Sequence, residues 1–547
     1  MQQAARQNIM PLQNILQGNY NTGNSPYQIK LPIELGIRIE DNDPVRLLDS
    51  FVEAMDLTEL CNSYGRHVKK TADPIKLFKI VVFGMMKKIY SARGLQEACR
   101  KNIDFMYLLD GSPVPDHATF ARFVSNHFSK CSEKMMSKMT LLLKELGEIS
   151  GETIFIDGTK IEAYANKYTF VWKKAVSKNM EKMAEKISVF VNNCIKDFDI
   201  QSISGTELSL RFLKKMRKKL YAIKHERKIQ FVHGIGKKKS KLQKATEELE
   251  AYIQRTKKYI MEKYICGDRN SYSKTDHDAT FMRLKEDAMR NGQLKPAYNV
   301  QHGVDSEYIV WADISAHPTD TLTLIPFLRK AEEMLGFRYK NIVADAGYES
   351  EENYVFIESN GQDAYIKPAN YEISKTKKYR TDIGKFENMT YDPSRDIYIC
   401  KNGKELKITG VRRRKSGSGY VSESTVYTCS DCKGCPFKTQ CIKGNNCNTP
   451  MDDRSKTLSI SKRKEELRKK DLERILSEHG TQLRVNRSIQ AEGSFAIVKE
   501  DMDFRQYSYR GKASALAQTI LIAFAHNFNK LHHKIQSKRT SSHLFTV

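Results

Sequence analysis

The sequence has no apolar run long enough to cross a membrane. Its most apolar stretches, residues 80–86 and 515–525, fall well short of the ~20 residues that a spanning helix requires. The first residues, MQQAARQNIMPLQNILQ, contain no continuous apolar core after a basic start, so we expect no signal peptide. We therefore expect a cytosolic protein with no membrane partner.

A disulfide framework is also not expected, because the cytosol is reducing. The chain nevertheless has 11 cysteines, and several cluster between residues 400 and 447. Cys429, Cys432, Cys435 and Cys441 have a spacing compatible with a tetrahedral Zn²⁺ site, and Cys400 or Cys447 could replace one of them. The alternative is a set of free thiols in a small inserted lobe. We favour a structural zinc ion, because exposed free cysteines are prone to oxidation.

Acidic residues are too few to balance the basic ones. There are 91 Lys and Arg against 65 Asp and Glu, which gives a formal net charge of +26. Such a charge attracts a polyanion, and nucleic acid is the commonest one. An anionic membrane surface or a simple gain in solubility would also fit the charge alone.

The first part of the chain predicts a flexible lead over residues 1–40 and a helical domain over 41–150. Asp73-Pro74 is typical of a helix start, Ser91 can cap a second helix, and Pro115-Asp116 can open a third. A helix over 116–128 could read DNA through His117 and Arg122. However, the gap that separates it from the helix over 92–101 is longer than a helix-turn-helix allows.

The pattern then changes to a mixed α/β order that continues to residue 535. Buried strands are predicted at 153–158, 297–302, 308–316, 340–346 and 363–367, with a helix at 321–335. Two insertions interrupt this order: a basic helical hairpin over about 171–265, and a cysteine-rich segment over about 375–450. Helices are predicted again from about 461 to 534, and a basic tail follows over 536–547.

Three acidic residues come from separate predicted elements. Asp157 and Asp345 each end a predicted strand, and Glu492 lies in a helical segment over 487–499. Carboxylates brought together in this way can bind two divalent ions, which activate the attacking oxygen and stabilise the leaving one during displacement at phosphate. Each residue also has an ordinary interpretation, as a turn residue or a solvated helical glutamate.

Seven short segments of the chain resemble bacterial insertion-sequence transposases of the DDE class. Three of them surround the acidic residues: 156–163 (IDGTKIEA), 343–348 (VADAGY) and 487–499 (RSIQAEGSFAIVK). The others lie in the helical region, at 90–93 (YSAR) and 115–123 (PDHATFARF), and in the tail, at 509–512 (YRGK) and 525–527 (AHN). The resemblance covers about residues 40–535.

This resemblance implies a ribonuclease-H-like catalytic domain over 151–535, with Asp157, Asp345 and Glu492 binding Mg²⁺ or Mn²⁺. It also implies that Lys499, seven residues and about two helical turns beyond Glu492, contacts DNA phosphate. Many relatives carry a Tyr-x2-Arg-x3-Glu-x6-Lys signature, but here Val485 and Ser488 occupy the Tyr and Arg positions. Arg487 is one residue away from the expected arginine position, about 100° around a helix, so its replacement of that contact stays open.

The implied substrates are double-stranded DNA at the element's terminal repeats and at the target, bound by a homodimer at the bacterial nucleoid. Basic residues beside the cysteine cluster, Arg412, Arg413 and Arg414, are further candidates for DNA contact. Two other functions fit the sequence. One is a nuclease or resolvase of the same fold, and the other is a non-catalytic, zinc-containing DNA-binding regulator.

Overall fold

The computed structural model describes residues 38–65, 72–200, 209–234, 236–284, 292–444 and 449–545. The lead predicted over 1–40 lies almost entirely outside these ranges, as do Cys447 and the last two residues of the predicted tail. None of the described helices is both long enough and apolar enough to cross a membrane.

The N-terminal region is helical, as predicted. It consists of α1 (Pro44–Ala54), α2 (Thr58–Asn62), α3 (Pro74–Met86), α4 (Ala92–Lys101), α5 (Ile103–Leu109), α6 (His117–Arg122) and α7 (Ser129–Glu145). The three predicted starts are confirmed, because the side chains of Asp73, Ser91 and Asp116 each accept a hydrogen bond from the first helical turn. The third helix does not stop near 128, since a π-helical turn, Phe123–Phe128, joins α6 to α7.

A six-stranded mixed sheet follows. Its strands are β1 (Thr153–Glu162), β4 (Thr280–Arg283), β5 (Leu294–Asp305), β6 (Tyr308–Ser315), β7 (Asn341–Ala344) and β8 (Asp363–Ile366). The order is β4-β5-β1-β7-β8, and β6 also pairs with β5. The pairs of β5 with β1, β4 and β6 are antiparallel, whereas β1 with β7 and β7 with β8 are parallel. The predicted strands are thus all present, and helices α11 (Leu324–Leu335) and α12 (Glu351–Ser359) connect the later ones.

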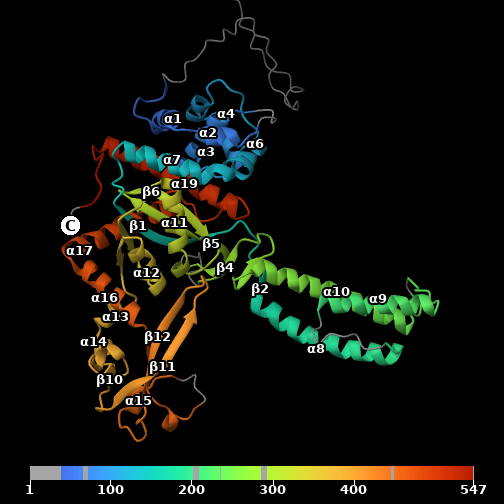
Figure 1. Cartoon of the computed structure of the whole chain (residues 1–547). Coiled ribbons are helices and arrows are strands. Elements are labelled where there is room, and N and C mark those ends of the chain that lie inside the picture. Colours follow the sequence, from blue (N-terminus) through green and yellow to red (C-terminus); the bar gives the residue numbers. More distant parts are fainter. Residues whose placement is uncertain are drawn as a thin grey trace, which may run out of the picture.

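Helix α19 (Lys512–Gln536) joins the helical region to the sheet. It packs against α3 and α7 on one side and against β6 on the other, and Figure 1 shows it between these layers. Every residue from Ala515 to Phe528 is buried, so this part of the helix is covered by protein on all sides. One continuous core therefore runs from the N-terminal helices through α19 into the sheet.

The first insertion is a long helical arm of α8 (Lys173–Phe198), α9 (Leu210–Glu226) and α10 (Lys241–Cys266). It contains three helices, so the predicted two-helix hairpin is wrong in number. The helices pack around their own apolar core, which includes Ile187, Leu213 and Leu249. The short strands β2 (Phe170–Trp172) and β3 (Ser271–Ser273) pair at the base of the arm. Figure 1 shows the arm projecting sideways from the sheet.

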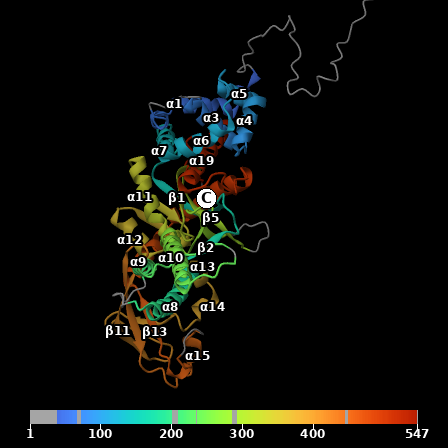
Figure 2. The ribbon, with the colours of Figure 1, turned by 90° about the vertical axis from the view of Figure 1, so that its right-hand side faces the viewer.

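The second insertion forms a lobe around a five-stranded antiparallel sheet. Its strands are β9 (Thr390–Asp392), β10 (Ile397–Ile399), β11 (Glu405–Lys415), β12 (Val421–Cys429) and β13 (Thr457–Ile460). A turn at Asn402-Gly403 connects β10 to β11, and Gly403 there has a φ of 69°. Short helices α13 (Tyr371–Ser374), α14 (Lys377–Arg380) and α15 (Lys438–Cys441) accompany the sheet. In Figures 1 and 2 the lobe and the N-terminal helices lie at opposite ends of the molecule.

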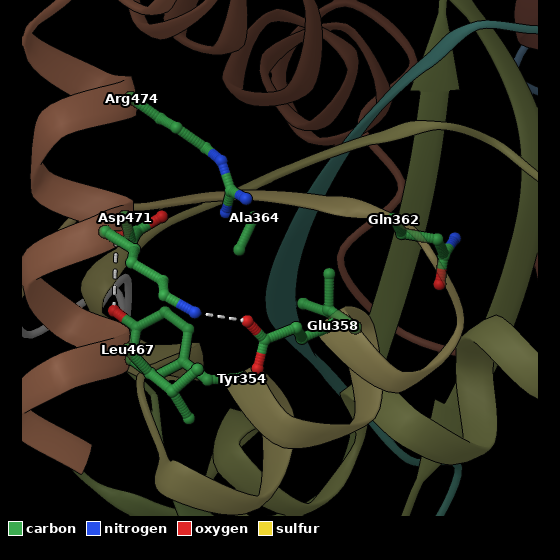
Figure 3. A pocket seen from close by; sticks show the side chains of 9 residues that line it. Tyr354, Glu358, Gln362, Ala364, Leu467, Asp471 and Arg474 are labelled. Atoms are coloured by element: carbon green, nitrogen blue, oxygen red, sulfur yellow. Dashed lines mark hydrogen bonds and ion pairs between the residues drawn. The ribbon is translucent and has the colours of Figure 1, made fainter. Parts of the chain in front are cut away.

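The chain returns to the central sheet through α16 (Lys462–Leu476) and α17 (Glu478–Arg487). Helix α16 packs against α12 and β8 around the fully buried Asp471, whose carboxylate accepts hydrogen bonds from the Tyr354 hydroxyl at 3.2 Å and the Ile366 amide at 3.0 Å. Figure 3 shows these side chains around a small cavity, which the Lys470–Glu358 ion pair also borders. Burial raises the pKa of Asp471 to about 7.

Candidate active site

Strand pairing places Asp157 and Asp345 next to each other. The parallel ladder of β1 and β7 ends with the pair Ile156 and Ala344, so the following residue on each strand is an aspartate. The prediction that Asp157 ends its strand is wrong, because β1 continues to Glu162 through its antiparallel ladder with β5. Asp157 is instead the first residue of β1 beyond the pairing with β7, so β1 has no paired strand on its β7 side from this residue on.

Glu492 reaches the same place from the C-terminal helices. Residues Ser488–Glu492 form a π-helical turn that follows α17 and contacts both β1 and β5. The next residues are the short helix α18 (Gly493–Ala496) and a second π-helical turn, Ile497–Asp501. The segment is helical as predicted, but it is not a regular α-helix. The seven residues from Glu492 to Lys499 therefore do not correspond to two α-helical turns.

The π-helical turn explains the displaced arginine. In a π-helix the hydrogen bonds join residues five apart, so side chains at that spacing come to the same face. The Arg487 Nη2 donates to Glu492 Oε1 at 2.6 Å, five residues away, and its Nη1 lies 3.8 Å from Asp157 Oδ2. A π-helical turn contains about one residue more than an α-helical turn, which compensates for the displacement of the arginine from position 488 to position 487. Arg487 therefore lies between Asp157 and Glu492.

Several charged side chains lie close to Asp157. The Asp157 side chain is 18% exposed, and burial raises its pKa to about 6. A hydrogen bond from the Gly158 amide and the Arg487 guanidinium lower this pKa, while the negative charges of Asp345 and Glu492 raise it. Asp345 and Glu492 therefore both lie within electrostatic reach of Asp157. A bound cation would relieve their repulsion.

A fourth carboxylate, Asp320, lies near Asp345 and near the glycine that follows Asp157. It begins the 3₁₀ turn Asp320–Leu322, and its Oδ1 accepts hydrogen bonds from Asn299 at 2.7 Å and Gln301 at 3.1 Å. Gln301 also accepts a hydrogen bond from the buried Tyr348 hydroxyl, so its amide group has one orientation. Sequence reasoning missed Asp320, because it precedes a helix in a loop and follows no strand directly.

Gly158 and Gly347 have no side chain, and the acidic and amide side chains of the site occupy the space beside them. A Cβ atom at Gly158 would lie 2.5 Å from Gln301 Nε2 and 2.8 Å from Asp320 Oδ1. A Cβ atom at Gly347 would lie 3.0 Å from Asp345 Oδ1 and 3.4 Å from Asp320 Oδ2. Asp320 therefore lies between the segments that carry Asp157 and Asp345. The glycine after Asp157 allows this close approach.

The donor set suits a hard divalent cation, since it consists of carboxylate oxygens around a position that a positive guanidinium already borders. Among the described residues, however, no three His, Cys, Asp or Glu side chains stand in a ready-made metal-binding group. In this arrangement Arg487 holds Glu492 in an ion pair. Metal binding by all three acidic residues requires Glu492 to leave that pair.

The predicted DNA contacts are spread over the molecule. Lys499 is half-buried and lies near His302, a buried histidine of β5. Arg122 is exposed on α6, where the His117 Nδ1 lies 3.0 Å from Asp116 Oδ1.

The tip of the basic hairpin formed by β11 and β12 lies near Leu322, in the turn that Asp320 begins. The tip is anchored to α12, because Ser416 and Ser418 donate to Glu352 and Tyr420 donates to Glu351. Exposed side chains follow on β11: Arg412, Arg413 and Arg414. Arg413 is paired across the hairpin with Glu423 at 2.6 Å, whereas Arg412 and Arg414 lie opposite serines. The hairpin thus presents Arg412 and Arg414 on one face and the Arg413–Glu423 pair on the other.

Two models of known protein families match this chain, one in its N-terminal part and one in its C-terminal part. A family model described as "Transposase DDE domain" matches residues 399–532, which include Glu492 and Lys499. A second, described as "Transposase domain (DUF772)", matches residues 33–126, which include His117 and Arg122. No curated protein and no solved structure matches the chain. The two family matches confirm the resemblance of this chain to insertion-sequence transposases of the DDE class.

Proposed function

We propose that the protein cuts DNA at the ends of an insertion sequence and joins the freed ends to target DNA. The observation that carries this proposal is that Asp157 and Asp345 follow paired positions of β1 and β7, and that Glu492 lies on a π-helical turn packed against β1 and β5. The carboxylates would hold Mg²⁺ or Mn²⁺, which activates the attacking oxygen and stabilises the leaving oxygen. Both transposase family matches support this assignment.

The reaction would proceed by two displacements at phosphorus. In the first, a water oxygen attacks the phosphodiester at the element's end, and the bond to the 3′ oxygen breaks, which leaves a 3′ hydroxyl. In the second, that hydroxyl attacks a target phosphodiester, and a new bond to the element forms as a target 3′ oxygen leaves. Asp157, Asp345 and Glu492 would act as metal ligands, while Asp320 and Gln301 would hold the neighbouring polar groups in place.

Several finer features belong to the same proposal. The sheet has three antiparallel strands, β6, β5 and β1, followed by the parallel β7 and β8, which supports a ribonuclease-H-like catalytic domain over 151–535. The helices over 41–150 would form a DNA-binding domain. Lys499, Arg122, His117 and the arginines of β11 would contact phosphates or bases, and two copies would pair the ends of the element at the nucleoid.

The position of the basic hairpin supports a DNA path that leaves the active site along β11. The hairpin tip lies beside the turn that carries Asp320, since a Cβ atom at Gly417 would lie 3.8 Å from Leu322. Arg414 and then Arg412 follow at increasing distance from the tip along β11. Arginines that neutralise phosphates supply affinity without sequence information. We infer that the lobe supports the DNA flanking the scissile phosphate.

The test uses purified protein with a DNA fragment that carries the element's end and a supercoiled target plasmid. We expect 3′-hydroxyl ends and strand-transfer products that require Mg²⁺ or Mn²⁺. Asp157→Asn, Asp345→Asn and Glu492→Gln should each reduce both products by more than about 100-fold, above the usual cost of removing an outer-shell partner of a metal. DNA binding should persist in these variants. Asp363→Asn, outside the site, is the matched control.

Other outcomes would favour the alternatives. Cleavage without joining would indicate a nuclease or resolvase of the same fold. DNA binding without any cleavage, and full biological activity of Asp157→Asn, would indicate a regulator and overturn the proposal.

A further inference from the structure

The cysteine-rich lobe encloses a cavity that is lined with thiols. Five of its lining residues are cysteines, Cys400, Cys429, Cys432, Cys435 and Cys441, which come from β10, β12 and the loops around α15. The cavity has a volume of ≈ 20 Å³, about the room that a single water molecule needs. Cys400 and Cys441, which are more than 40 positions apart in the sequence, thus line the same small cavity.

The lobe has little else to hold it together. Its apolar core is small and consists largely of residues from the five strands: Met389, Tyr398, Leu406, Tyr427, Cys429, Leu458 and Ile460. Small lobes with few buried apolar residues usually need a metal or disulfides for stability. All five cavity cysteines are free thiols in this structure. A metal bound to these thiols would supply the missing stabilisation.

The backbone around the thiols would suit a metal–thiolate centre. The backbone amide of Lys456 donates to Cys432 Sγ at 3.4 Å, and such N–H···S bonds stabilise a charged sulfur. Gly434, inside the Cys432-x2-Cys435 turn, has a φ of 68°, which lets the chain fold back so that both thiols face one side. Three lysines, Lys404, Lys438 and Lys456, also line the cavity.

Four of the five thiols are more accessible than the fifth. Cys429 is 1% exposed and belongs to the apolar core on the same face of β12 as Tyr427, whereas the other four are only half-buried. All five thiols line one cavity of ≈ 20 Å³, so the four half-buried thiols face a common space.

We infer that Cys400, Cys432, Cys435 and Cys441 bind one structural Zn²⁺ ion, and that Cys429 is a core residue and not a ligand. This ligand set differs from the one that the sequence spacing predicts, which contains Cys429 and omits Cys400. Binding releases the thiol protons to solvent and forms four Zn–S bonds. No three of the described thiols already stand at ligand geometry, so the ion draws them together across the cavity. The inference is independent of the proposed catalytic activity.

The first experiment measures metal content. The full chain, purified without chelator, is analysed by elemental mass spectrometry, and we expect about one zinc per chain with sulfur neighbours at about 2.3 Å in X-ray absorption. Cys400→Ser, Cys432→Ser and Cys441→Ser should lose the zinc. Cys429→Ala should keep it, as should Cys194→Ser, a control thiol buried in α8. Asp157→Asn should also keep it, which excludes zinc bound at the acidic site.

A second measurement does not depend on the folding of variants. Wild-type protein is alkylated before and after removal of the metal with a mercurial reagent and a chelator, and the modified cysteines are identified by mass spectrometry. We expect Cys400, Cys432, Cys435 and Cys441 to become reactive together on metal removal. A wild-type protein that holds no zinc, or holds iron, would overturn the inference. So would zinc that persists in Cys432→Ser, or a requirement for Cys429 with none for Cys400.

Discussion

The guanidinium of Arg487 is hydrogen-bonded to the carboxylate of Glu492 at 2.6 Å, although five residues separate them. The same guanidinium lies 3.8 Å from Asp157, so a positive side chain occupies the space between two acidic residues of the candidate site. A metal bound by Glu492 would have to compete with this guanidinium.

Arg487→Ala is therefore expected to tighten binding of Mn²⁺ to the DNA-free protein. A charge-assisted hydrogen bond contributes about 1.5–3 kcal/mol, so we expect a gain of roughly tenfold in affinity at pH 8, measured by electron paramagnetic resonance. Arg505→Ala, which removes an exposed ion pair with Glu500, is the control and should have no effect. Weaker Mn²⁺ binding by Arg487→Ala would show instead that the arginine orients Glu492 for the metal.

Gly158→Ala should reduce cleavage by about 10–100-fold, the range typical for disturbing the outer shell of a metal site. The added methyl group would meet Gln301 and Asp320, so one of these side chains must move. Gly410→Ala is a suitable control, because a Cβ atom there meets nothing within 4 Å. Both variants should give a normal circular dichroism spectrum. Full activity of Gly158→Ala would show that the Asp320–Gln301 arrangement is not needed for the reaction.

The basic hairpin predicts different effects for neighbouring arginines. Arg412→Ala and Arg414→Ala should each weaken DNA binding and lower the slope of affinity against salt by about one. Arg413→Ala should change the slope less, because Glu423 already neutralises this side chain within the hairpin. The measurement is fluorescence anisotropy with a labelled DNA duplex over a series of salt concentrations. Equal changes in DNA affinity and salt slope for all three variants would contradict the placement of Arg412 and Arg414 on the DNA-binding face and of Arg413 on the opposite one.

Asp471 predicts a pH-dependent stability. Its pKa is about 7 in the folded protein and near 3.8 when exposed, so folding favours its protonated form. Its contribution to stability is fully present below about pH 4 and is lost as the pH rises to about 7. Asp471→Asn should therefore stabilise the protein at pH 8 by about 1–3 kcal/mol, given 1.36 kcal/mol per pKa unit, and should have little effect at pH 4.

The check is urea denaturation of both proteins at the two pH values. Asp363→Asn, on the neighbouring strand, provides a control for a partly exposed carboxylate. A stabilisation of equal size at both pH values would contradict the role of the Asp471 charge.

Much of the fold could be predicted from local patterns. The helix starts at Asp73, Ser91 and Asp116 depend on neighbouring residues only, and the strands of the central sheet are short runs of apolar and β-branched residues. The end of β1 could not be predicted, because its last residues are held by β5, which lies far away in the sequence. The number of helices in the arm was also missed, since one basic helical pattern covers several helices.

The site was predictable in part for the same reason. Asp157 and Asp345 follow apolar runs that any strand prediction finds, and the register of two parallel strands then brings them together. Asp320 reaches the site through hydrogen bonds with Asn299 and Gln301, which no spacing rule encodes. The position of Arg487 depends on a π-helical turn, and a sequence reading based on regular α-helical geometry cannot anticipate it.

The location of α19 has a consequence for biosynthesis. This helix contacts α3, α7 and β6, although it follows almost every other described element along the chain. During translation, the apolar faces of α3, α7 and β6 that contact α19 stay uncovered until residues 512–536 have left the ribosome. We therefore expect nascent chains that stop before α19 to be targets for chaperones and proteases, so that only complete chains accumulate.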